Sequence, residues 1–205
     1  MRKISLFILL SLSLLISFIS CTLPPVETPN DDSAEMDEAC SLLNALSCKE
    51  YETVTVEIKT TTAFAQLSSK YVISDNEVSY SIEQLNTLSA EGEFSELSPD
   101  FKTVFTGSAV VEGGEIIELD GNSVDLPSYS ELKGRFNFDK DNFDKVSLEK
   151  NSFSADVISP SAFYGTDVDV SDLSICVEYT NDALISLSIS YKTDNATVNT
   201  VYSFE

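Results

Sequence analysis

Histidine is absent from this chain of 205 residues. Its absence excludes Ser-His-Asp and Cys-His catalysis, imidazole general bases, and zinc or copper sites with histidine ligands. No two cysteines have the CxxC spacing, which disfavours a cysteine metal site or a redox motif. We therefore expect a protein without a metal or other cofactor and without enzymatic activity.

Positive charge is scarce as well. Lys and Arg number 12 against 34 Asp and Glu, so the net charge is −22 at pH 7. Such a surface repels phosphate backbones, and we expect no nucleic-acid partner. Among so many acidic residues, pairs of carboxylates arise by chance, and no sequence cue selects one of them. A carboxylate-based envelope hydrolase is therefore the least favoured alternative.

Only one long hydrophobic run is present, from Ile4 to Ile19, with Arg2 and Lys3 before it and Ser20 after it. A positive start, a short apolar run and a small residue are typical of an export signal, so we predict a signal peptide over residues 1–20. The run contains several serines and is shorter than the roughly 20 residues of a spanning helix. A retained transmembrane anchor is the alternative interpretation.

The signal ends at a cysteine. The segment Phe18-Ile19-Ser20-Cys21 resembles the lipobox of bacterial lipoproteins, with Phe18 where leucine is usual. The resemblance implies cleavage before Cys21 and lipid on its sulfur and on the new N-terminus. Several acyl chains together give stable anchoring. We therefore expect a membrane partner through Cys21 and a location in the bacterial cell envelope, with the domain outside the cytoplasmic membrane. Simple secretion, with Cys21 as a free or disulfide-bonded thiol, is the alternative.

Behind the cysteine, residues 21–33 contain three prolines and no apolar period, which predicts an extended tether. Residues 34–205 then read as one domain. A helix is predicted over Glu35–Ser47, with apolar residues at helical spacing and Ser33 as its N-cap. Cys40 and Cys48 would lie about 12 Å apart on an intact helix, too far to form a disulfide. A disulfide from Cys176 to either of them stays open.

From Tyr51 onward the apolar period changes to two, which indicates strands. Turn residues between the runs predict antiparallel neighbours. The long run Phe143–Ile158 changes its apolar parity, so a bulge or break is expected near Lys150–Ser152. We expect Ile185, Leu187, Ile189 and Tyr191 to face inward. Pro160 is expected to open one helical turn that ends near Gly165. The predicted strands are Val54–Lys59, Phe64–Ile73, Glu77–Leu85, Phe101–Val111, Ile116–Leu119, Leu132–Phe138, Phe143–Ile158, Leu173–Tyr179, Leu184–Tyr191 and Thr197–Phe204.

These elements predict a mainly β fold: a curved antiparallel meander of about ten strands, an open half-barrel or barrel, with one N-terminal helix. One helix cannot cover so many strands, so the sheet must curl. The acidic segment Asp139–Asp144 has Phe143 and Asp144 where a calcium loop needs an oxygen ligand and glycine, so we interpret it as a turn.

The concave apolar face is the candidate site. If it is incompletely filled, it forms a cavity for an apolar ligand, and if it is filled, it is a core. The residues expected to line it are Phe101, Phe105, Phe136, Phe138 and Tyr80.

The order of anchor, tether, helix and meander resembles bacterial envelope lipoproteins of unknown function. In architecture it also resembles the half-barrel lipid carriers of the LolA and LppX type, without a matching ligand residue. We therefore expect a non-enzymatic, membrane-anchored surface lipoprotein of binding or structural type, with an envelope protein or glycan as partner. The alternative is a carrier of lipid or another apolar ligand on the concave face.

Overall fold

The computed structural model describes residues 33–63, 65–74, 76–86, 102–112, 115–121 and 136–205. In these ranges the chain forms helix α2 (Ser33–Ser47), the one-turn helix α4 (Pro160–Tyr164) and the 3-10 helix η3 (Lys140–Asn142). The strands are β1 (Val54–Thr61), β2 (Ala65–Ile73), β3 (Glu77–Asn86), β4 (Lys102–Glu112), β5 (Glu115–Gly121), β6 (Phe143–Glu149), β7 (Ser152–Val157), β8 (Ser171–Tyr179), β9 (Leu184–Lys192) and β10 (Thr197–Phe204).

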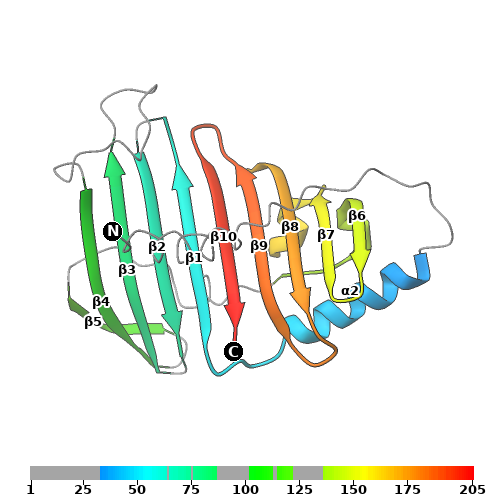
Figure 1. Ribbon diagram of the computed structural model, residues 1–205, viewed down its shortest axis with the longest axis horizontal. Helices are drawn as coiled ribbons and strands as arrows, with labels where there is room; N and C mark the ends of the chain where they lie inside the picture. Colours follow the sequence, from blue (N-terminus) through cyan, green and yellow to red (C-terminus); the bar gives the residue numbers. More distant parts are fainter. Residues whose placement is uncertain (1–32, 64, 75, 87–101, 113–114, 122–135) are drawn as a thin grey trace, which may run out of the picture.

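All strands belong to one 10-stranded sheet in the order β5-β4-β3-β2-β1-β10-β9-β8-β7-β6 (Figure 1). Every neighbouring pair is antiparallel. Strands β5 and β6 form the two edges, so the sheet is open rather than closed into a barrel. The predicted fold class, an antiparallel β fold with one N-terminal helix, is confirmed in its open form.

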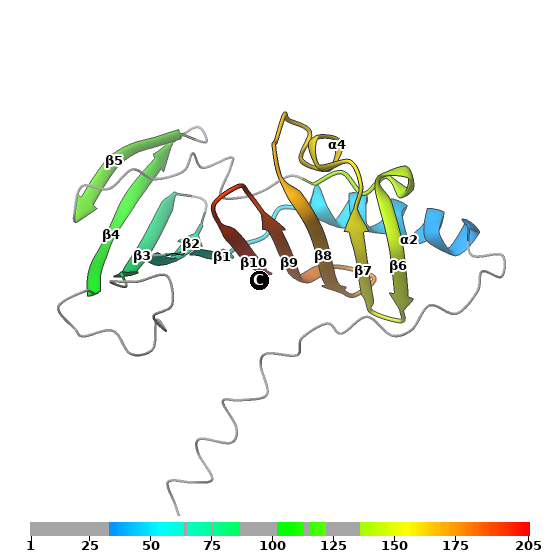
Figure 2. The same cartoon turned by 90° about the horizontal axis from the view of Figure 1, so that it is seen from above.

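The sheet is curved. Figure 2 shows β4 and β5 curling at one end towards the side on which α2 and α4 lie at the other end. Helix α2 buries Cys40, Leu43 and Leu46 on this concave side, within the same core cluster as the inner residues of the strands. It begins at Ser33, so this residue is the first of the helix and not its predicted cap.

The alternation of buried and exposed residues along the strands agrees closely with the apolar period of two in the sequence. In β1, Val54 and Val56 are buried while Glu57 and Lys59 are exposed, and the same alternation runs through β7, β8 and β10. The inner side chains are buried away from water and the outer ones remain solvated, which is usual for an antiparallel sheet with one solvated face.

The prediction of a strand over Leu132–Phe138 is wrong for its described part. Phe136 and Phe138 lie in an irregular segment, although both are buried. Asn44 of α2 satisfies the backbone there: its Nδ2 donates to the Phe138 carbonyl at 2.8 Å, and its Oδ1 accepts from the Phe138 N–H at 2.9 Å. A side chain thus replaces a neighbouring strand.

The long run Phe143–Ile158 is broken into two strands, which is one of the two outcomes expected near Lys150–Ser152; the other was a bulge. It forms the hairpin of β6 and β7, with Glu149 opposite Ser152 and a turn at Lys150 and Asn151. A separate bulge lies within β6, where Lys145 has a φ of 49°. The described residues form ten strands, and this number agrees with the prediction only because the split into β6 and β7 adds a strand while residues 136–138 form none.

Ile185 was expected inside and lies outside, with 47% of its surface exposed. The ladder between β8 and β9 shifts here, since Glu178 pairs with Ser186 while Tyr179 pairs with Leu184. The irregularity turns Leu184 inward and Ile185 outward, because one extra residue reverses side-chain parity.

Candidate functional site

The residues predicted to line a cavity fall on two halves of the sheet. Tyr80 is buried on β3, and Phe105 is half-buried on the neighbouring strand β4. Phe136 and Phe138 lie in the segment before η3, on the opposite half. Phe101 and the lipid-attachment candidate Cys21 lie outside the described residues.

The half near the helices contains a dense aromatic cluster. Phe138 lies with its ring centroid 5.8 Å from that of Phe163 and 6.4 Å from that of Phe153, both edge-on. Phe143 is 5.2 Å from Phe153, and Phe136 stacks on Phe163 at 5.3 Å. Phe138, Phe153 and Phe163 are almost completely buried. On this half the aromatic residues pack against one another, as they do in a protein core.

The concave face carries no buried charge. Among the described residues, the buried polar side chains other than tyrosines are Ser69 on β2, Thr200 on β10 and Asn142 of η3, and none of them is ionisable. The carboxylates and ammonium groups of four ion pairs in the described ranges are instead exposed or half-buried, and one of these pairs joins Asp37 of α2 to Lys140 of η3. Burying an unpaired charge is costly, so the sheet separates an uncharged inner face from a charged outer one.

Burial of the inner face decreases towards one end of the strands. On β2, Ile73 is 1% exposed, Tyr71 4%, Ser69 7% and Leu67 38%. On β1, Val56 is fully buried whereas Ile58 is only half-buried. The concave face is therefore tightly packed at the end where β2 finishes and more open at the end where β2 begins.

Three tyrosines face the concave side on the half of the sheet near the helices. Tyr202 of β10 and Tyr164 of α4 both contact the ring of Phe136, at centroid distances of 5.2 Å and 6.1 Å. Tyr191 of β9 has the same inward parity. Burial raises the pKa of Tyr202 to about 12, and the nearby Tyr191 adds to the rise. The pKa of Tyr164 is raised by burial first and then by Tyr191 and Tyr202, so the three hydroxyls lie close enough to influence one another.

No local sequence pattern marks this group of tyrosines. Inward parity was expected for Tyr191, and Tyr202 shares the period of its strand. Nothing in the local sequence links them to Tyr164, which comes from a one-turn helix. The contact with Phe136 that gathers Tyr164 and Tyr202 arises only in the folded chain.

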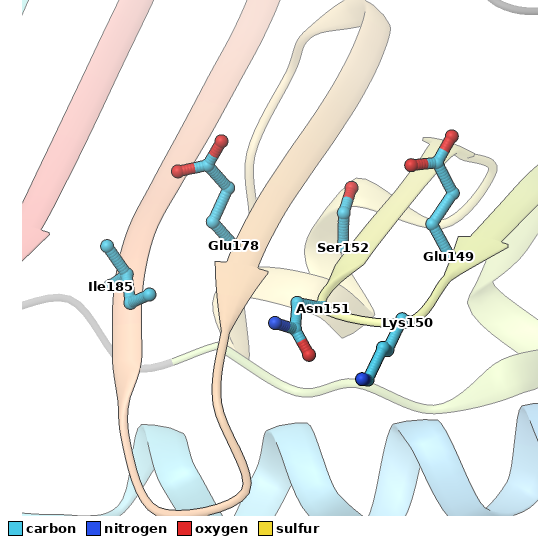
Figure 3. A pocket seen from close by; sticks show the side chains of 6 residues that line it. All are labelled: Glu149, Lys150, Asn151, Ser152, Glu178 and Ile185. Atoms are coloured by element: carbon cyan, nitrogen blue, oxygen red, sulfur yellow. The ribbon is translucent and has the colours of Figure 1, made fainter.

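A hollow on the outer face lies at the β6–β7 turn, and its volume is about 380 Å³. In Figure 3 the carboxylates of Glu149 and Glu178 rise on either side of Ser152. The hollow is open to solvent, and Ser186 donates a hydrogen bond of 3.3 Å to Glu178 Oε2. Ser152 has no imidazole to activate it in a chain without histidine. The arrangement offers solvated carboxylates rather than an enclosed catalytic pair.

Among the described residues, no group of three or more His, Cys, Asp or Glu side chains is placed to hold a metal ion. None of the helices in these ranges has the length and apolar character that crossing a bilayer requires. No protein-family model matches the chain, and no curated protein matches it significantly.

Proposed function

We propose that this protein is a non-enzymatic lipoprotein of binding or structural type, anchored in the bacterial cell envelope through lipid on Cys21. The observation that carries the proposal is the two-sided character of the sheet. Its inner face is uncharged and its outer face is charged and solvated. A strongly acidic domain of this kind remains soluble beside a membrane and repels anionic headgroups, so it needs a covalent anchor to stay there.

Anchoring is tested by metabolic labelling. The full chain is expressed in a bacterial host that is fed an alkyne fatty acid, and the label is detected on the protein in the membrane fraction. We expect Cys21→Ala to lose the label, because it removes the sulfur that takes the lipid. Cys48→Ala is the matched control and keeps the label, since Cys48 is exposed beyond α2. Unlabelled wild-type protein would reject the anchor.

Carriage of lipid or another apolar ligand on the concave face is the second candidate. The observation that favours it is the decrease of burial along β2 from Ile73 to Leu67, which leaves apolar inner surface partly open at one end. A carrier should copurify with solvent-extractable lipid, detectable by mass spectrometry. Protein freed of lipid should bind a fluorescent fatty-acyl probe saturably. Protein without bound lipid and without probe binding would reject carriage and leave the anchored structural protein.

A further inference from the structure

The tyrosine recess, defined by Tyr164, Tyr191 and Tyr202, contains hydroxyls without a protein partner. In the described part of the chain, no hydrogen bond is made by these three hydroxyls or by that of Thr200, which lies between Tyr202 and Val198 on the inner face of β10. Tyr202 is only 7% exposed and Thr200 only 8%. Two polar side chains that are more than nine-tenths buried thus offer unused hydrogen-bonding groups to the concave side.

These hydroxyls reach accessible space. Within the described ranges, no side-chain nitrogen or oxygen that is fully shut off from solvent lacks a partner. The unpartnered hydroxyls of Tyr202 and Thr200 therefore each touch space that a water molecule or a ligand atom can enter. Buried polar groups almost always have a hydrogen-bond partner, so we expect a water molecule or a ligand atom to bind these two hydroxyls.

A continuous row of inner residues leads away from the recess. Tyr191 pairs with Val198, Val198 with Thr60, Thr60 with Leu67, and Leu67 with Gln84. The row crosses β9, β10, β1, β2 and β3, a span of about 19 Å at the usual strand spacing. Leu67 is exposed, Tyr191, Thr60 and Gln84 are half-buried, and Val198 between Tyr191 and Thr60 is buried. This is the open end of the concave face, and its length is that of a long fatty acyl chain.

The electrostatics of the tyrosine recess favour an uncharged ligand. None of the buried side chains that the structure describes on the inner face is positively charged. A carboxylate or phosphate would find no counter-charge among these residues, and burying an unpaired charge is expensive. Burial raises the pKa values of all three tyrosines, so they stay neutral phenols at physiological pH and donate hydrogen bonds to a neutral acceptor.

We propose that the tyrosine recess binds the ester group of a neutral acylglycerol, with its acyl chain lying along the row that runs from Tyr191 to Gln84. The phenols donate hydrogen bonds to the ester carbonyl, and the Thr200 hydroxyl forms hydrogen bonds with the glycerol hydroxyls. This inference rests on the carrier function proposed above and names its ligand class. It also predicts discrimination against fatty-acid anions and anionic phospholipids.

The test uses the full chain in phosphatidylcholine nanodiscs and a monoacylglycerol with a photoreactive diazirine on its acyl chain. Cross-linking is competed with unlabelled monooleoylglycerol or with oleate. We expect monooleoylglycerol to compete at least tenfold better than oleate. We expect each of Tyr164→Phe, Tyr191→Phe and Tyr202→Phe to weaken binding about fivefold, the equivalent of one hydrogen bond. Tyr179→Phe is the matched control, a buried tyrosine of the same inner face outside the recess, and leaves binding unchanged.

A second pair of variants tests the row. Leu67→Gln should weaken binding of the acyl chain, whereas Val201→Gln, on the outer face of β10, should not. Equal competition by oleate, or binding that is indifferent to all three phenols, would overturn the ester site while leaving a lipid carrier. Failure of every lipid to compete, with no cross-link above background, would reject the carrier together with the ester site.

Discussion

The packing of α2 on the sheet determines the burial and the pKa of the Cys40 thiol. Its side chain is 5% exposed on α2, and burial, followed by the charges of Asp139 and Asp37, raises the pKa of its thiol to about 11 from 9.0. Cys48 lies just beyond the same helix and is exposed. Cys40 and Cys48 do not bridge each other, as their separation on an intact helix predicted. The disulfide from Cys176 to either of them, which the sequence left open, is not formed.

The shifted thiol makes stability depend on alkaline pH. Because the folded-state pKa of Cys40 is raised, the thiol form is favoured in the folded protein, and this contribution is complete below pH 9. As pH rises from 9 to 11, the unfolded chain loses the proton first, and the free energy of unfolding falls. We expect Cys40→Ala to flatten this fall in urea titrations and Cys48→Ala to leave it unchanged. Parallel curves for Cys40→Ala and the wild type would contradict the assignment.

Residue-level prediction from sequence succeeded wherever strand parity was undisturbed and failed at one bulge. The inward faces of Leu187 and Ile189 were expected and are buried. Ile185, in the same strand, is exposed because the ladder to β8 shifts between Glu178 and Tyr179. A bulge depends on the partner strand, so the sequence of β9 alone cannot locate it.

At the scale of elements, Asn44 explains why a run with strand periodicity is not a strand. Its side-chain amide gives the Phe138 backbone both hydrogen bonds that a neighbouring strand would have supplied. The two residues are 94 positions apart in the sequence. Lys140 reinforces the contact through an ion pair of 2.6 Å with Asp37. Local sequence indicated that Phe136 and Phe138 belong to the inner face, but it could not show that α2 rather than a strand would hold them there.

Replacing this amide should loosen the helix and the aromatic cluster together. Asn44→Leu conserves approximate size but leaves the Phe138 N–H and carbonyl unpaired in a part-buried place, which costs about 3 kcal/mol of unfolding free energy. Asn44→Asp keeps the acceptor and should lose less. Ser41→Ala, at an exposed position of α2, should stay within about 0.5 kcal/mol of the wild type. Urea denaturation followed by circular dichroism measures all three, and an unaffected Asn44→Leu would show that the pair is dispensable.

At the scale of the whole molecule, the decisive contact joins the first and last strands of the sheet in chain order. The hairpins could be read from turn residues, but the pairing of Val56 with Tyr202, which unites β1–β5 with β6–β10, has no local signal. The same pairing brings the tyrosine recess on β9 and β10 next to the open row on β1 and β2. For this reason the candidate site could be predicted only as a concave face, and its polar members emerged from the folded sheet.

This topology predicts an uneven distribution of local stability. Strand β10 is hydrogen-bonded on both sides, by β1 and β9, over nearly its whole length. Strand β6 has one neighbour, β7, and its ladder is interrupted at Lys145. Exchange of backbone amides requires the ladder to open, so we expect amides of β10 to exchange at least about tenfold more slowly than those of β6. Hydrogen–deuterium exchange with mass spectrometry on peptides spanning residues 197–204 and 143–149 measures the difference. Comparable rates would show that the junction of the two halves opens as readily as the edge, and that the sheet does not unfold from its borders inward.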